Sequence, residues 1–346
     1  MVVIRPVARG DLDSLMELAH LTGFGLTTLP RDRALLSDRI DESENSFLRL
    51  AQKPRGETYL FVMEDLENHR VVGTCGVTSK VGGFEPFYAY RIATTKHESE
   101  MLNVSKEIPT LTLVAEHSGP CEIGSLFLHP DYRRDGNGRL LSLSRFLFIA
   151  EYRHRFEPQV IAEMRGVIDA KGHSPFWEAV GKHFFEIDFT RADYLSMVDK
   201  KFIADLMPRH PIYVPLLPPE AQGVIGYVHP ETVPALKLLE SEGFCITDLV
   251  DIFEAGPVVS VKRDEIRTVK ESARSVVEEI GEVSGGAVMH LLNPRADARM
   301  ARGMVKVTGP GKVRLDEPTA RALEVKAGDA VRHAPTHGRG IERGLP

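Results

Sequence analysis

The sequence is poor in the features that mark several classes of protein. Its three cysteines, Cys75, Cys121 and Cys245, are widely spaced among 346 residues. This indicates neither a disulfide framework nor a cysteine-based zinc site, and it fits a reducing cytoplasm. No apolar run reaches the ~18 residues of a membrane span, and residues 1–5 read as a strand and not as a signal peptide. We therefore expect a cytoplasmic protein with no membrane partner.

An excess of charge and the commonest ligand motifs are missing too. The net charge is −6, so a general nucleic-acid surface is not expected and any anion site must be local. The histidines have no metal spacing and no H-E-x-x-H occurs, which predicts no metal. The dinucleotide fingerprint G-x-G-x-x-G lacks its third glycine, and residues 181–183 and 311–313 lack the hydroxyl of a P-loop. An anion site has to be of another kind.

One stretch, residues 121–151, does carry a specific pattern. An apolar run at 121–128, bounded by prolines at 120 and 130, predicts a buried strand. A basic turn with two glycines follows, and apolar residues at helical spacing then run from Leu140 to Leu147. The unit is therefore strand, basic turn, helix. The residues of the turn that we expect to bind an anion are Arg133, Arg134, Gly136 and Gly138.

Such a turn is suited to a phosphate. The first amides of a helix have no intrahelical partner and lie at the positive end of its dipole. Glycines let this backbone approach an anion closely, and arginines add charge-assisted hydrogen bonds. The alternative is a surface loop that is merely basic. The pattern R-x-x-G-x-G between a strand and a helix resembles the pyrophosphate turn of the GCN5-related N-acetyltransferase superfamily, which holds acyl-coenzyme A.

The rest of the chain agrees with an α+β fold of this type. We expect a strand at 2–7, a helix from Asp11, a second helix over 31–49 and a hairpin over 59–77. A strand follows at 159–166, a helix opens at Ser174-Pro175, and another helix spans 191–207. Residues 229–253 repeat the pattern of helix, Gly-Phe and strand, which predicts a duplicated fold.

This element order predicts three regions. Residues 1–188 form a first N-acyltransferase-like module with the pyrophosphate turn, and residues 189–270 a second, shortened one. Residues 271–346 form a small β-rich appendage, with a mobile tail from His333.

Many short blocks make the resemblance more specific. Together they are similar to the bacterial arginine N-succinyltransferase family, from residue 1 to about 270. The blocks are residues 22–30, 85–88, 125–128, 162–166, 174–177, 186–193, 202–204, 206–208, 210–213, 224–226, 228–230 and 251–253. This family transfers succinyl from succinyl-coenzyme A to the α-amine of L-arginine, the first step of arginine catabolism by the succinyltransferase route. The resemblance also implies a homo-oligomer, or a hetero-oligomer with a paralogous subunit.

The resemblance assigns roles to two residues. It implies that Leu126 contacts succinyl-coenzyme A, through a main-chain N–H that would bind the thioester carbonyl; from the sequence alone Leu126 is a core leucine. It implies that His229 is the proton donor, held rigidly by Pro230. A helix N-terminus lowers the pKa of a histidine, so an acid such as Glu231 would be needed to keep it protonated. The alternative is a histidine that only begins a helix.

The substrate contacts are open between several charged residues. The succinyl carboxylate needs an arginine, for which Arg91 and Arg165 are candidates. The guanidinium of L-arginine needs a carboxylate, for which Glu85, Glu116 and Glu163 compete. The aromatic stretch 82–91 is either part of a pocket for a small cation or a core strand. Ornithine or another amino acid as acceptor, and a non-catalytic paralogous subunit, are the rival functions.

Overall fold

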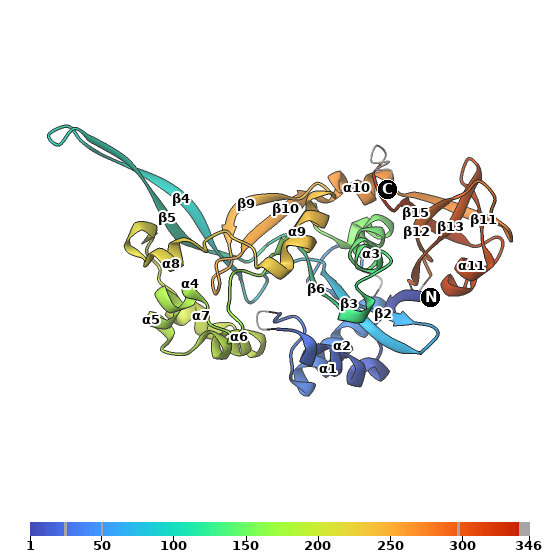
Figure 1. Ribbon diagram of the computed structural model, residues 1–346, viewed down its shortest axis with the longest axis horizontal. Helices are drawn as coiled ribbons and strands as arrows, with labels where there is room; N and C mark the ends of the chain where they lie inside the picture. The colour runs from blue at the N-terminus through green and yellow to red at the C-terminus, as the bar shows by residue number, and fades with distance from the viewer. Residues whose placement is uncertain (24–25, 50, 296–297, 339–346) are drawn as a thin grey trace.

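One long sheet runs through the whole molecule. The computed structural model describes residues 1–23, 26–49, 51–295 and 298–338. The sheet has fifteen strands in the order β12-β15-β11-β14-β13-β1-β2-β3-β6-β7-β10-β9-β4-β5-β8. Helices cover both of its faces, as Figure 1 shows. The predicted α+β class is confirmed, and the two similar parts share one continuous sheet. Among the described residues no helix is both long and apolar enough to cross a membrane.

The N-terminal strands alternate apolar side chains between two cores. On β2, Leu60 and Val62 face α1 and α2, whereas Tyr59 and Phe61 face α3, as the two-residue period of a strand requires. The expected helices and hairpin are confirmed. Their bounds are β1 Val2–Pro6, the 3-10 turn η1 Arg9–Asp11, α1 Leu12–Leu21, α2 Arg33–Leu48, β2 Thr58–Asp65 and β3 Arg70–Thr78.

The strand–turn–helix unit lies at the centre of the molecule (Figure 1). Strand β6 runs Cys121–Leu128, helix α3 runs Asn137–Glu151, and strand β7 runs Gln159–Glu163. Helix α3 is buried on almost every side, because the sheet lies on one face and the C-terminal strands on another. Short 3-10 turns, η2 Pro130–Tyr132 and η3 Arg153–Arg155, join these elements.

The second part contributes helices on one face and two strands that enter the sheet. The helices are α4 Pro175–Ala179, α5 Gly181–Phe185, α6 Phe189–Val198, α7 Lys201–Leu206, α8 Pro219–Gln222 and α9 Val233–Glu240. The strands and turns are β8 Ile212–Tyr213, η4 Val214–Leu216, η5 Pro230–Thr232, β9 Cys245–Val250 and β10 Pro257–Lys262. Strand β10 pairs with β7 on one side and β9 on the other. The His-Pro turn, helix and strand therefore occur twice, as η2–α3–β7 and η5–α9–β9.

The single helix predicted over 191–207 is wrong, because two helices meet there. Asp199 is extended, and its carboxylate accepts the Lys201 N–H at 2.7 Å, so the chain starts a new helix. The break brings Lys200 into a junction instead of a helix face. Lys200 thereby comes within Coulomb range of several carboxyl groups at the centre of the sheet.

A long hairpin, which we call the arm, projects from one end of the molecule (Figure 1). It consists of β4 Phe87–Ser99 and β5 Val104–Glu116, and the sequence did not predict its outer half. At its base, Tyr88 and Tyr90 are buried in the core, so the core-strand interpretation of the aromatic stretch is the one observed. At its tip, Met101 is 90% and Leu102 65% exposed.

The C-terminal strands close into a small barrel at the other end. The elements are η6 Arg263–Glu265, α10 Arg267–Glu271, β11 Ala273–Ile280, β12 Ala287–Leu292, β13 Met300–Gly309, β14 Lys312–Leu315, α11 Glu317–Leu323 and β15 Ala330–Pro335. Pairing of β12 with β13 closes the ring, and Ile4 with Met300 joins it to β1. His333 lies in β15, so the predicted start of a mobile tail at this residue is wrong; residues 339–346 lie outside the described residues.

Candidate active site

Strands β6 and β7 separate in the middle of the sheet. They run parallel and pair only at Cys121–Val160 and Glu122–Ile161. Beyond Gly124 the register of β6 against β3 shifts, and Ser125 has φ 53. A bulge with a non-glycine residue in the left-handed region costs about 1–3 kcal/mol and is typical of functional sites. It lies immediately before Leu126, whose predicted main-chain role stays a prediction.

A buried arginine supports this bulge from behind. Arg145 of α3 is 2% exposed, and its Nη1 donates to the Gly124 carbonyl at 3.4 Å. Its remaining donors bind the Ser142 carbonyl and hydroxyl. Burial lowers the pKa of this guanidinium. A positive charge therefore lies directly behind the strand segment that we expect to face a thioester.

The basic turn has the conformation expected of an anion site. Asp135 and Gly136 have φ 53 and φ 70, and α3 begins at Asn137. Within the described residues, the first-turn amides of Gly138 and Arg139 donate to no backbone carbonyl. They are therefore available to an external acceptor at the positive end of a 15-residue helix.

The two arginines of the turn differ in what they contact. Arg133 donates from Nε to the Leu128 carbonyl at 3.1 Å, and its guanidinium lies 5.7 Å from the centre of the Phe127 ring. Arg134 is 71% exposed and lies 3.8 Å from the Asp135 carboxylate. Arg133 thus holds the turn against the strand, whereas Arg134 is free to reach a ligand.

Acidic residues gather where β6 and β7 separate. Glu122 of β6 and Glu163 of β7 share a hydrogen bond, and Asp251 lies within Coulomb range of Glu163. Desolvation, then repulsion by Glu122, raises the pKa of Glu163 well above its ordinary value. Glu163 is nevertheless exposed. Its carboxyl is accessible although neighbouring groups desolvate it, so it is placed to meet a cation. We call Glu122, Glu163 and Asp251, together with the groups that border them, the acidic recess.

Other charged groups border the recess, and several have unsatisfied atoms. Burial raises the pKa values of Glu122 and Asp251 as it does that of Glu163, and the positive charge of Lys200 opposes the rise in all three. Buried polar atoms are normally hydrogen-bonded. Yet four atoms here have no partner among the described residues: Thr28 Oγ1, Arg39 Nε, Arg165 Nε and Glu254 Oε2.

Contacts place these four atoms around the same strands. Thr28 lies 3.8 Å from where a Cβ of Gly124 would be, and Arg39 interacts with Glu122. Glu254 accepts the Gly166 N–H at 2.8 Å and is close to Arg165. This approach requires glycine, because a Cβ on Gly256 would lie 2.0 Å from the Met164 carbonyl. Unsatisfied donors and acceptors on every side of the recess fit a polar, charged ligand.

His229 lies at the edge of this recess. Its N–H donates to the Arg165 carbonyl at 2.8 Å, and its Nδ1 accepts the Glu231 N–H at 3.2 Å. Burial and then Arg165 lower the pKa of His229, and these effects outweigh the opposite effect of Glu231. Glu231 does not keep the ring protonated, so that expectation is wrong. Glu231 is instead exposed, with its carboxylate 3.7 Å from Arg165.

The structure brings some of the predicted residues together and separates others. Glu163 ends β7, Arg165 follows it, and His229 is hydrogen-bonded to the Arg165 carbonyl. Glu85 is in an exposed loop before β4, and Arg91 pairs with Asp248 at 3.2 Å on the surface. Glu116 is exposed at the end of β5. Glu85 and Arg91 are thus outside the recess.

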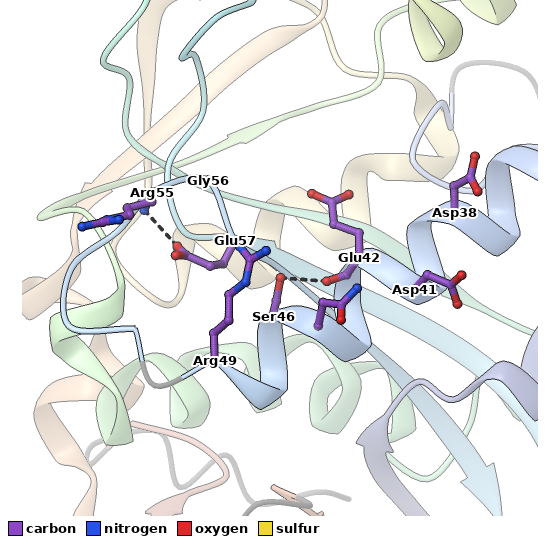
Figure 2. A pocket seen from close by; sticks show the side chains of 9 residues that line it. Asp38, Asp41, Glu42, Ser46, Arg49, Arg55, Gly56 and Glu57 are labelled. Carbon is purple, nitrogen blue, oxygen red and sulfur yellow. Dashed lines mark hydrogen bonds between the residues drawn. The ribbon is translucent and has the colours of Figure 1, made fainter.

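The sequence pattern missed five residues of the recess: Arg39, Glu122, Lys200, Asp251 and Glu254. Only Glu122 had a local signal, a charge within an apolar strand. A surface hollow lies elsewhere, on α2 and the following loop. It has a volume of about 480 Å³ and is lined by Glu42, Arg55 and Glu57 among others (Figure 2). It contains none of the predicted site residues. Among the described residues, no group of three or more histidine, cysteine or acidic side chains is placed to hold a metal.

Comparison with known proteins identifies relatives along nearly the whole chain. The model of the family described as arginine N-succinyltransferase beta subunit matches residues 2–268. The arginine N-succinyltransferase of Enterobacter sp. (strain 638) is 46% identical and covers 96% of this chain and 97% of its own. Arginine N-succinyltransferase subunit beta of Pseudomonas aeruginosa is 45% identical, and the match covers 96% of this chain and 98% of that protein.

A solved structure agrees with the fold. Arginine/ornithine succinyltransferase subunit AI from Pseudomonas aeruginosa has a TM-score of 0.89 and 33% identity, with 98% of this chain and 99% of that chain covered. The predicted acyl-coenzyme A N-acyltransferase-like fold is confirmed.

Proposed function

This chain belongs to the arginine N-succinyltransferase family, and from that premise we propose that it transfers succinyl from succinyl-coenzyme A to the α-amine of L-arginine. The products are N2-succinyl-L-arginine and coenzyme A, and the reaction opens arginine catabolism. One observation carries the proposal. The separated ends of β6 and β7 meet a phosphate-type turn on one side and a recess of acids with unsatisfied polar atoms on the other.

The coenzyme site is the β6–α3 turn. The amides of Gly138 and Arg139 bind the diphosphate, with Gly136 allowing close approach and Arg134 adding charge. The thioester then lies along β6, where the N–H of Leu126 binds its carbonyl. Arg145 behind the bulge stabilises negative charge on that oxygen as the amine attacks.

The amino acid lies in the acidic recess. Its guanidinium binds the Glu122–Glu163 pair. Two carboxyl groups that share one proton keep one negative charge, and a bound cation lowers their pKa values. The succinyl carboxylate binds Arg165, whose Nε has no other partner in the described chain. Glu85 lies in an exposed loop, and Arg91 pairs with Asp248 on the surface, so neither residue takes these roles.

His229 moves the proton. A lowered pKa keeps its imidazole neutral near pH 7, so it accepts a proton from the attacking nitrogen. The carbon–sulfur bond breaks as the amide forms, and the imidazolium returns that proton to the departing thiolate. His229 thus first accepts a proton from the amine and then acts as the proton donor to the thiolate.

The direct test is release of coenzyme A thiol by the purified chain with succinyl-coenzyme A and a panel of amines. We expect L-arginine to be used best, with ornithine as the rival acceptor. Mass spectrometry of the product fixes the site of acylation. No release with any amine, from a chain that still binds coenzyme A, would favour the non-catalytic paralogous subunit.

The arm supports assembly with a second copy of this chain. An isolated two-stranded hairpin is marginally stable in water, and this one ends in exposed Met101 and Leu102. We expect an oligomer by light scattering, and its dissociation in Met101→Ser/Leu102→Ser with catalysis at the monomer site retained. An oligomer that forms only with a paralogous subunit would replace this arrangement. The free thiols of Cys75, Cys121 and Cys245 support a cytoplasmic location.

A further inference from the structure

The C-terminal barrel reaches into the coenzyme turn through one side chain. Arg302 of β13 donates from Nη1 to the Asp135 carbonyl. The same nitrogen lies 2.5 Å from where a Cβ of Gly136 would be. A guanidinium from a region far along the chain therefore lies against the two left-handed residues of the turn.

No carboxylate among the described residues neutralises the charge of Arg302. Among the described residues, its only hydrogen bond is to a backbone carbonyl, and it forms no ion pair with a carboxylate. By contrast, neighbouring Arg267 is saturated by Glu242 and Glu271, at 2.5 and 3.0 Å. A guanidinium that pairs with no acid retains its capacity to bind a phosphate.

A second, independent observation marks the same place. His290 lies opposite Arg302 in the β12–β13 pairing, is 1% exposed, and its Nδ1 has no hydrogen-bond partner. Burial, followed by Arg302, Arg139, Arg267 and His337, lowers the pKa of His290 to about 3. Three arginines, Arg302, Arg139 and Arg267, therefore lie around one neutral imidazole on the face of the barrel that packs on α3.

Arg139 extends this cationic surface onto α3. It occupies the first turn of that helix, one residue after Gly138, and its Nη1 donates to the Thr336 carbonyl at 3.4 Å. Burial and then Arg267 lower its pKa. Arg267 is paired with acids, so Arg302 and Arg139 are the groups that leave positive charge beside the turn, in a protein whose net charge is −6.

We propose that Arg302 and Arg139 bind a phosphate group of coenzyme A, so that the C-terminal barrel forms one wall of the coenzyme site. This inference rests on the proposed function in so far as the coenzyme binds at the β6–α3 turn. Coenzyme A carries two kinds of phosphate that fit the chemistry, the diphosphate and the 3′-phosphate. The barrel thereby acquires a binding role in addition to packing.

Three thioesters distinguish these possibilities: succinyl-coenzyme A, its dephospho form without the 3′-phosphate, and S-succinyl-pantetheine without any phosphate. The variant Arg302→Gln keeps a donor for Asp135 but removes the charge. We expect kcat/KM for succinyl-coenzyme A to fall about 10- to 100-fold, with succinyl-pantetheine unaffected. A fall for succinyl-coenzyme A alone assigns the 3′-phosphate; an equal fall for the dephospho form assigns the diphosphate.

A barrel arginine at the other end of α3 provides the matched control. Arg274 is 60% exposed and lies 3.7 Å from Glu151, the last residue of that helix. Arg274→Gln is expected to leave all three kcat/KM values unchanged. An Arg302→Gln variant that loses the three activities equally, or none of them, would overturn the inference, because Arg302 would then only shape the turn or do nothing.

Direct binding keeps this test separate from the proposed reaction. Calorimetry with coenzyme A and with pantetheine is run on the wild-type chain, Arg302→Gln and Arg139→Gln. A wild-type chain that binds coenzyme A but transfers no succinyl group contradicts the reaction and still tests the arginines. Equal affinity of Arg302→Gln and wild type for coenzyme A contradicts the inference alone.

Discussion

Two turns of the molecule share one local structure and differ in their surroundings. His129-Pro130 and His229-Pro230 each precede an acidic residue, and the two histidines have φ/ψ of −52/135 and −55/137. In both, Nδ1 accepts the N–H two residues on, at 3.3 and 3.2 Å. The two turns therefore have the same backbone conformation and the same local hydrogen bond.

The two turns differ in the segment that comes after each and in the groups that face it. After His129 the chain inserts a left-handed turn before α3, which frees amides for an anion. After His229 the chain enters α9 at once, and Pro234 removes one amide of its first turn. In the proposed function the first turn serves the coenzyme, whereas the second places its histidine beside the acidic recess. A His-Pro motif becomes functional only through its surroundings.

The largest effect expected is on kcat, and it should differ between substitutions of the two histidines. His229→Ala is expected to lower kcat about 10²- to 10⁴-fold, because proton transfer by a positioned side chain contributes this much. His129→Ala, whose ring packs edge-on against Tyr132, should change kcat by less than about threefold. Thiol release and coenzyme A binding measured on both variants give the comparison. Equal losses in the two would show that the histidines only begin their helices.

A change at Glu163 should affect the KM for L-arginine and leave the KM for succinyl-coenzyme A nearly unchanged. Glu163→Gln is expected to raise the KM for L-arginine about 10- to 100-fold, since a charge-assisted hydrogen bond is lost, with little change in the KM for succinyl-coenzyme A. Glu107→Gln on the exposed arm is the matched control. If the KM for the thioester rises instead, the acidic recess belongs to the coenzyme.

The pH profile tests the state of His229. Its pKa lies below the ordinary value of 6.5, so the neutral, active form predominates above that pH and is lost as the pH falls through the lowered pKa. We expect kcat to be flat from pH 7 to 8 and then to drop about tenfold per pH unit on the acid side. A kcat that declines as the pH rises from 6 to 8 would mean that the imidazolium is the active form.

The sequence predicts the first turn far better than the recess. Proline boundaries, glycines and helical spacing are local signals, so β6, the turn and α3 follow directly from residues 121–151. The encounter of Glu122 with Glu163 depends on the pairing of β6 with β7, and that with Asp251 on β10 and β9 entering the sheet beside β7. No local pattern encodes either. The reach of Arg302 to Asp135 is likewise a tertiary event, whereas the helix break at Asp199 rests on a local capping contact that the apolar pattern overlooks.

The smallest effect expected concerns the first turn alone. Gly136→Ala forces a side chain into the left-handed region, at about 1–2 kcal/mol, and toward Arg302. The KM for succinyl-coenzyme A should rise about tenfold, and that for L-arginine should stay constant. Gly311→Ala is the matched control, because Gly311 has a similar φ of 67 with open space around it in the barrel. It should lower thermal stability without changing either KM. A similar rise of KM in both variants would mean that backbone strain acts through overall stability, and the turn after His129 would then lose its special role as the coenzyme site.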